Sequence, residues 1–306
     1  MSAILSRACF EAAVSYVRER GRPLDAALLD HTLGRGSSEA VMVALIGFQN
    51  PDGGFGGGLE PDMRSSASTG IAASIGLRLL ARVEAPAKHP TVVGLIDWLS
   101  GALDRDAGVW PVVGEDVESA PHAPWWTWSA DMAGNWNGFR LNPTAEILAH
   151  LYRYRAAAPA DLIESAEAGL RRTLAETNLI EGAYDLKCAI RLAEADGLPA
   201  GLAKPLEALV RSSIAAHSPD DEHVSPFDAA ATPASPFADV VDGQIEPALA
   251  RLIESQTGDG GWAWNPDWDW SYVDRKAGAE AVRDWRGWIT RENLETLIAY
   301  GRVDMA

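Results

Sequence analysis

Apolar residues recur along this chain at the three- and four-residue spacing of amphipathic helices, and almost no stretch alternates as a strand does. In residues 3–19, for example, Leu5, Ala12 and Tyr16 fall on one helical face. The pattern therefore predicts an all-α fold. The predicted helices span roughly 3–19, 37–48, 66–83, 90–103, 143–157, 161–176, 183–195, 202–215, 244–255, 276–285 and 291–300.

Capping residues mark several of these predicted boundaries. Asn142 followed by Pro143 is a start signal, because Asn accepts a bond from a first-turn amide and Pro needs no donor there. Asp161 and Glu164 have the spacing of a capping box, and Thr290 is predicted to open the last helix. Glycines are expected where helices end, at Gly197, Gly287 and Gly301.

The composition is that of a globular protein. Hydrophobic residues make up 47% of the 306 residues and charged residues 23%, with no low-complexity tract and no linker-like block. We therefore predict one compact domain over residues 1–306.

Charge and cysteine content restrict the partners and the compartment. The formal net charge is -17, without a cluster of basic residues, which argues against nucleic acid or an anionic membrane surface as a partner. Cys9 and Cys188 are far apart and predict no disulfide framework. We find no secretory signal and no run of 18 apolar residues, so we predict a cytoplasmic protein that is not an integral membrane protein.

A glycine-rich motif occurs twice. "QNPDGGF" begins at Gln49 and "QTGDGGW" at Gln256, so both read Gln, two residues, Asp-Gly-Gly and an aromatic residue. A glutamine carries a donor and an acceptor, which suits the unpaired carbonyls and amides at helix ends. A phosphate loop would need Lys-Ser or Lys-Thr after the glycines, and Leu-Glu follows the first copy instead. The motif predicts a joint between neighbouring helices.

These two segments resemble the QW-type repeats of the terpene cyclase and protein prenyltransferase superfamily. "DRDAGVWPVV", residues 104–113, resembles a degenerate third copy without its glutamine. The resemblance implies an α/α toroid in which about six helical hairpins of about 50 residues each surround a central cavity. It covers nearly the whole chain and is weaker as an indication of a reaction.

The active-site motifs of these relatives are absent or altered here. The D-x-D-D motif that protonates an alkene is missing, and the nearest match is "DWDW" with Asp267 and Asp269, which otherwise fit a solvated loop. The D-D-x-x-D motif that binds magnesium is also missing. Asp185 and Cys188, with His217 or His223 downstream, resemble a zinc site, although the first two are three residues apart rather than two. Cys188 equally fits a small core residue. Only the resemblance suggests zinc or magnesium, so the cofactor stays unassigned.

Tryptophan is concentrated in two helix-poor segments. Nine of the 12 tryptophans fall in residues 109–139 and 261–278. Their rings could stabilise a carbocation, hold an isoprenoid chain or stack on sugars, or the first segment could simply close one end of the toroid. The candidate substrate-binding residues are Trp110, Trp125, Trp126, Trp128, Trp136, Trp262, Trp264, Trp268 and Trp270.

Three further polar residues are candidates for catalysis. Glu60 and Asp62 directly follow the first joint, where a carboxyl group near aromatic walls would bind its proton more tightly and act as an acid. Asp62 could instead cap a helix that begins near Ser65. His122 lies between two prolines beside three tryptophans, and its imidazole titrates near neutral pH.

The sequence as a whole favours an isoprenoid-handling protein that binds a small apolar substrate or lipid in a tryptophan-lined cavity. One alternative is a noncatalytic toroid that binds a lipid or a protein. Another is a carbohydrate-active α/α-toroid enzyme, which would need two carboxyl groups about 5 to 10 Å apart across an open groove. The repeated joint favours the isoprenoid superfamily.

Overall fold

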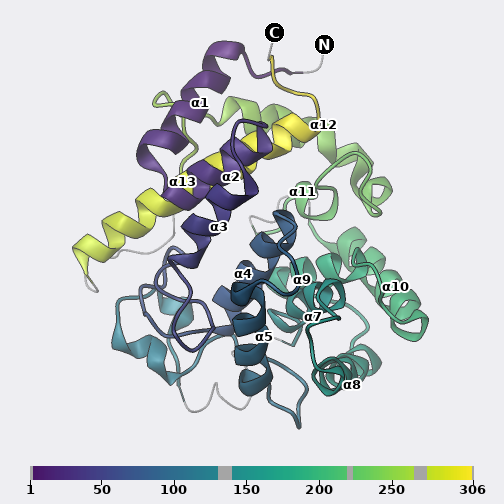
Figure 1. The fold of residues 1–306 in the computed structure, drawn as a ribbon. Helices are drawn as coiled ribbons and strands as arrows, with labels where there is room; N and C mark the ends of the chain where they lie inside the picture. The colour runs from purple at the N-terminus through teal and green to yellow at the C-terminus, as the bar shows by residue number, and fades with distance from the viewer. Residues whose placement is uncertain (1–2, 130–139, 219–222, 265–273, 305–306) are drawn as a thin grey trace. The chain divides into compact units, whose positions relative to one another are not determined.

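The computed structural model describes residues 3–129, 140–218, 223–264 and 274–304. The fold is all-α, as the apolar periodicity predicts (Figure 1). Within these ranges the only β-type pairings are isolated bridges, such as the one between Leu5 and Val303. The chain divides into two compact units, one of residues Met1–Leu45 and Ser225–Ala306, the other of Ile46–Val224. A single domain over residues 1–306 stays a prediction.

The first unit joins the two ends of the chain. Its helices α1, α2 and α13 pack against one another, and α11 packs against α12. The amide of Leu5 donates to Arg302 O at 2.8 Å, and the amide of Asp304 donates to Leu5 O at 3.0 Å. The bounds are α1 Arg7–Arg20, α2 Pro23–Thr32, α3 Ser38–Ile46, α11 Pro226–Ala229, α12 Ala238–Glu254 and α13 Arg275–Ala299.

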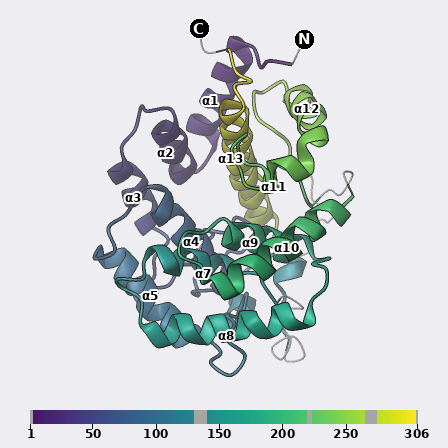
Figure 2. The same cartoon turned by 90° about the vertical axis from the view of Figure 1, so that its right-hand side faces the viewer.

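The second unit is built from helices that pack in pairs. Helices α4, α7 and α9 are successive neighbours, and each also packs against the helix that follows it, which is α5, α8 or α10. Figure 2 shows α7, α9 and α10 side by side. The bounds are α4 Gly70–Arg82, α5 Pro90–Ala102, η1 Glu115–Ser119, η2 Pro124–Trp126, α7 Thr144–Arg153, α8 Ala160–Glu176, α9 Ala183–Ala193 and α10 Ala200–Ala216.

The predicted break between the last two helices is wrong, because α13 runs without interruption from Arg275 to Ala299. Gly287 lies inside this helix, where a Cβ atom would be 2.7 Å from the Cα atom of Gly21. This glycine therefore allows two backbones to approach closely and does not end a helix. Thr290 is likewise an interior residue and is fully buried.

Other predicted helix boundaries were confirmed only in part. Gly301, with a φ angle of 63°, directly follows the C-cap of α13, as predicted. Gly197, with a φ angle of 87°, lies four residues beyond the end of α9, whose C-cap is Glu194, so it does not end that helix. Helix α8 begins at Ala160, so Asp161 lies in its first turn, and no side chain caps its N-terminus. The capping-box prediction is therefore wrong. Helices α2 and α11 were not predicted.

None of the helices in the described ranges combines the length and the apolar character needed to cross a membrane.

Candidate functional site

Both copies of the glycine-rich motif form the same hydrogen-bonded joint. Nε2 of Gln49 donates to Gly53 O and to Thr91 O, both at 2.9 Å. Nε2 of Gln256 donates to Gly260 O and to Cys9 O, also at 2.9 Å. Thr91 and Cys9 lie in the first turns of α5 and α1, so each glutamine ties its own loop to the start of another helix. The predicted joint is confirmed, with the correction that these bonds go to two carbonyl groups rather than to a carbonyl and an amide.

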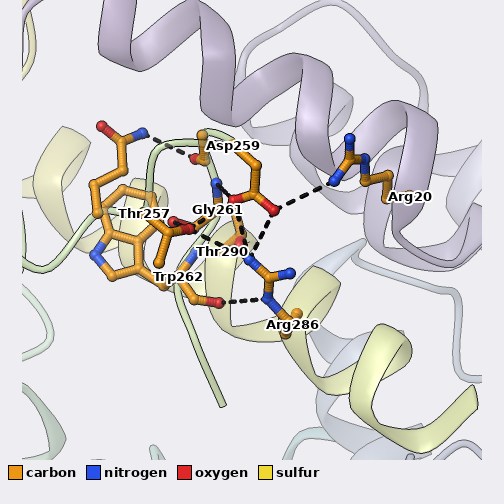
Figure 3. Close-up of polar contacts among 9 residues, drawn as sticks. Arg20, Thr257, Asp259, Gly261, Trp262, Arg286 and Thr290 are labelled. Carbon is orange, nitrogen blue, oxygen red and sulfur yellow. Dashed lines mark hydrogen bonds and ion pairs between the residues drawn. The ribbon is translucent and has the colours of Figure 1, made fainter. Parts of the chain in front are cut away.

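The aspartate of the second joint anchors its loop to two helices (Figure 3). Its carboxylate accepts hydrogen bonds from Thr257 at 2.6 Å and from Arg286 at 3.0 Å, and it pairs with Arg20 at 3.3 Å. The hydrogen bond from the Thr257 hydroxyl is the main cause that lowers the pKa of Asp259, and Arg286 contributes. Asp259 is therefore held as an anion by structural partners.

The glycines of the motif permit close approach to a second helix. Gly53 and Gly260 have φ angles of 92° and 91°, which L side chains rarely adopt. A Cβ atom on Gly53 would lie 2.2 Å from Gly94 O of α5, and one on Gly260 would lie 2.6 Å from Ala12 O of α1. A side chain at the first glycine of the Asp-Gly-Gly sequence would therefore collide with a neighbouring helix in both copies.

The degenerate third copy keeps the aromatic part of the joint. Trp110 Nε1 donates to Leu99 O and Trp262 Nε1 to Leu252 O, each at 2.8 Å. The amides of these tryptophans donate to hydroxyl groups, those of Thr144 at 2.9 Å and Thr290 at 3.0 Å. Both indoles are buried. Their contacts give Trp110 and Trp262 a role in joining helices, and substrate binding by them stays a prediction.

An arginine binds carbonyl groups of the loop in this third copy. Asp104 stands where the other copies have glutamine, and its Oδ1 accepts from the amides of Asp106 and Ala107. Arg172 of α8 then donates to the carbonyl oxygens of the same two residues, at 2.9 and 2.7 Å. A cation from the neighbouring helix therefore ties this loop to α8, through carbonyl groups at other positions of the loop than the one the glutamines bind.

We predict that Gln49→Glu destabilises the second unit by about 2 kcal/mol, because the carboxylate can no longer donate to Gly53 O and Thr91 O. Urea unfolding followed by circular dichroism measures the change. Gln244→Glu, on α12 and outside the joints, is the control and should change stability little. Equal effects of the two substitutions would contradict the role assigned to Gln49.

The residues that follow the first joint pair with the tryptophan-rich segment. Asp62 is 1% exposed, and its Oδ1 accepts a 2.6 Å hydrogen bond from Nε1 of Trp126. The backbones are also paired, since Ala123 N donates to Asp62 O at 2.9 Å and Arg64 N to Pro121 O at 3.0 Å. Thr69 caps α4, so the alternative in which Asp62 caps that helix is wrong. The structure thus brings together a carboxyl group and an indole that the sequence proposed separately.

His122 lies in the same pairing, opposite Met63. Its Nε2 is 3.4 Å from Oε2 of Glu118, and its Nδ1 is 3.0 Å from Ala123 O. The other oxygen of Glu118 accepts from Trp128 N at 2.6 Å. Trp125 is 46% exposed, in contrast to the buried Trp126 beside it. Asp62, His122, Trp125, Trp126 and Trp128 therefore belong to one region, and Glu60 is half-buried at its edge.

The three predicted zinc ligands have separate roles. Asp185 accepts from the amides of Leu141 and Asn142 at 2.9 and 2.7 Å and so fixes the chain before α7, while burial raises its pKa. Burial also raises the pKa of the Cys188 thiol. The ring of His223 lies beside that of Tyr184, with the ring centroids 6.1 Å apart. Over the part of the chain that is described, no three His, Cys, Asp or Glu residues are grouped to hold a metal ion.

Several candidates lie outside the described residues, namely Trp136, Asp267, Trp268, Asp269 and Trp270. Trp264 is described, and its ring stacks on that of Trp285 with centroids 5.5 Å apart. Trp285 was not among the candidates, because its only signal is an aromatic residue within a helix.

A buried charged cluster in the second unit was also missed. Glu146 of α7 is 2% exposed and lies 3.3 Å from Arg78 of α4 and 2.8 Å from Arg191 of α9. Burial opposes ionisation of Glu146, but Arg191 and Arg78 outweigh it and lower its pKa to about 2. Burial is the main cause that lowers the pKa of His150 to about 4. The sequence feature that could have indicated this cluster is the i, i+4 spacing of Glu146 and His150 in an apolar helix.

Searches against protein-family models, curated proteins and solved structures returned no match for this chain. The site therefore has to be interpreted from its own residues.

Proposed function

We propose that this chain is a member of the terpene cyclase and protein prenyltransferase superfamily that binds an apolar isoprenoid and protonates it with Asp62. The observation that carries the proposal is the buried hydrogen bond between Asp62 and Trp126. It places a carboxyl group that is shielded from water directly beside an aromatic ring. Removal from water favours the neutral form of a carboxyl group, which an acid that protonates an apolar group needs.

The helix arrangement supports membership of the superfamily. Three consecutive hairpins pair α4 with α5, α7 with α8, and α9 with α10, while α7 packs against both α4 and α9. An α/α toroid has the same order, with inner helices adjacent and each followed by an outer helix. The matching bonds of Gln49 and Gln256 add a second point of agreement.

The proposed reaction starts with proton transfer from Asp62 to an alkene. The π electrons form the new C–H bond, Asp62 becomes a carboxylate, and the substrate becomes a carbocation. Aromatic faces stabilise such a cation by about 0.5 to 2 kcal/mol each when they are desolvated. Loss of a proton from a neighbouring carbon returns that proton to Asp62 and releases an isomer of the substrate. The indole N–H of Trp126 fixes one carboxyl oxygen during both steps.

We predict that Asp62→Asn reduces product formation by about 100-fold or more, because the amide keeps the shape of the side chain but provides no acidic proton. The wild type and the variant would be incubated with farnesyl diphosphate, and products would be analysed by gas chromatography and mass spectrometry. Native mass spectrometry with the same ligand would report binding separately. Bound ligand without product in Asp62→Asn supports the acid role.

Two further variants sharpen this experiment. Trp126→Phe keeps the ring but removes the N–H donor, and it should lower the rate by about tenfold if the hydrogen bond orients the acid. Glu60→Gln tests the second carboxyl candidate, and unchanged product formation would remove Glu60. If the wild type binds the isoprenoid but gives no product, the noncatalytic lipid-binding alternative replaces the enzyme. If it does not bind, glycans should be tested next.

A further inference from the structure

The acid of the proposed function lies beneath a segment at the surface of the second unit. Residues 115–126, called the strap here, contain the short helices η1 and η2 and the chain between them. Three side chains of the strap are buried, those of Val117, Ala123 and Trp126, and its other residues are half-buried or exposed. The strap therefore has one face toward solvent and one face against the protein.

Hydrogen bonds fasten both ends of the strap to residues 62–65. At its C-terminal end, Trp126 Nε1 donates to Asp62 Oδ1 at 2.6 Å. Near its N-terminal end, the Ser65 hydroxyl donates to Asp116 O at 3.1 Å. Asp62 and Ser65 are each 1% exposed, whereas Asp116 is exposed. The strap therefore lies between this segment and solvent, and it covers Asp62.

A covered acid conflicts with the proposed reaction unless the cover moves. Proton transfer requires the acid to lie within hydrogen-bond reach of the reacting group, and Asp62 in this closed arrangement has almost no surface to offer a molecule that arrives from solvent. The strap can lift without unfolding a long helix, because η1 has five residues and η2 has three. Surface segments without long helices are among the parts of a protein that open most readily.

We propose that the strap is a lid, which opens to admit the apolar substrate to Asp62 and closes before proton transfer. This inference rests on the proposed function, because it takes Asp62 as the acid. Trp125 is 46% exposed and offers an apolar ring to an arriving isoprenoid, while Trp126 is 8% exposed and returns to Asp62 on closure. Closure then shields the carbocation from water, which would otherwise add to it.

A disulfide that locks the strap shut provides the test. Met63 and His122 face each other in an antiparallel bridge whose two hydrogen bonds lie on either side of them, so they form a non-hydrogen-bonded pair. The Cα atoms of such a pair lie about 4.5 Å apart, within the range of about 4.4 to 6.8 Å that a disulfide spans. The variant is Met63→Cys with His122→Cys in a Cys9→Ala background, because Cys9 is exposed and could form unwanted disulfides. The same protein after reduction is the matched control.

Hydrogen exchange measures the opening without any substrate. In the wild type, the amides of Arg64 and Ala123, which bond across the bridge, should be about tenfold or more less protected than that of Leu77 in the middle of α4. In the double variant, oxidation should raise the protection of Arg64 and Ala123 by about tenfold or more, and reduction should reverse this. Equal protection of Ala123 and Leu77 in the wild type would overturn the lid, because the strap would then open only when α4 unfolds.

Binding of farnesyl diphosphate, followed by native mass spectrometry after a fixed short incubation, tests the gate itself. The oxidised double variant should bind about tenfold less ligand than the reduced one, and Met63→Cys alone should bind equally after oxidation and reduction. Equal binding by the two forms of the double variant would overturn the lid while leaving Asp62 as the acid. If the wild type binds no isoprenoid, the proposed function fails and the gate fails with it, although exchange still shows whether the strap opens.

Discussion

Asp25→Asn is expected to destabilise the first unit by about 3 to 5 kcal/mol, because it removes the shared anion of a buried ion cluster. Asp25 of α2 is fully buried and lies 2.8 Å from Arg22 and 3.4 Å from Arg291. Both guanidinium groups also lie over the ring of Trp288, at 5.3 and 5.5 Å from its centroid. The neutral amide would leave Arg22 without the carboxylate that balances its charge in this buried setting.

Hydrogen exchange is the measurement that isolates this effect, since it reports the opening of α2 and α13 separately from the rest of the chain. The amides of both helices should exchange faster in Asp25→Asn, and the urea midpoint should fall. Glu11→Gln is the matched control, because the Arg7–Glu11 pair in the same unit is 62% exposed on both sides and should matter little. Equal exchange in the two variants would show that the buried cluster does not hold α2 to α13.

Local patterns in the sequence predicted most of the helices and the loop of each joint, because both depend on nearby residues. Apolar spacing marks helices such as α8 and α10, and the Gln-to-aromatic motif specifies its own loop, as in Gln49 bonding to Gly53. The break predicted at Gly287 failed because a glycine ends a helix and permits close packing equally well. Only the position of Gly21 distinguishes the two.

The candidate site depended on contacts between distant residues, and these were predicted less well. Asp62 and Trp126 were both proposed, but their direct hydrogen bond spans 64 residues and no local pattern encodes it. The pairing of Glu146 with Arg78 and Arg191 was missed for the same reason. A charged residue in an amphipathic helix is usually exposed, and only the packing of α4 and α9 against α7 makes this one buried.

Acidification is expected to destabilise the second unit in two successive steps. His150 has an ordinary pKa of 6.5 when unfolded and one of about 4 when folded. The unfolded state therefore binds more protons between these values, and about 3 kcal/mol is lost as the pH falls from 6.5 to 4. Glu146 has a pKa of 4.5 unfolded and about 2 folded. Its contribution, also about 3 kcal/mol, is present above pH 4.5 and is lost between 4.5 and 2.

Urea unfolding at a series of pH values separates the two steps. His150→Gln should abolish most of the loss between pH 6.5 and 4.5 while leaving the loss below pH 4.5, because glutamine does not titrate and Glu146 keeps Arg78 and Arg191. The charged groups that act on His150 are Glu146, Arg78, Arg191 and Arg153, so these must stay unchanged. His31→Gln, in the other unit, is the control and should leave the profile of the second unit as in the wild type. If His150→Gln has the wild-type profile down to pH 4.5, His150 is not the neutral base that this packing requires, and the loss above pH 4.5 comes from another group, since Glu146 acts only below that pH.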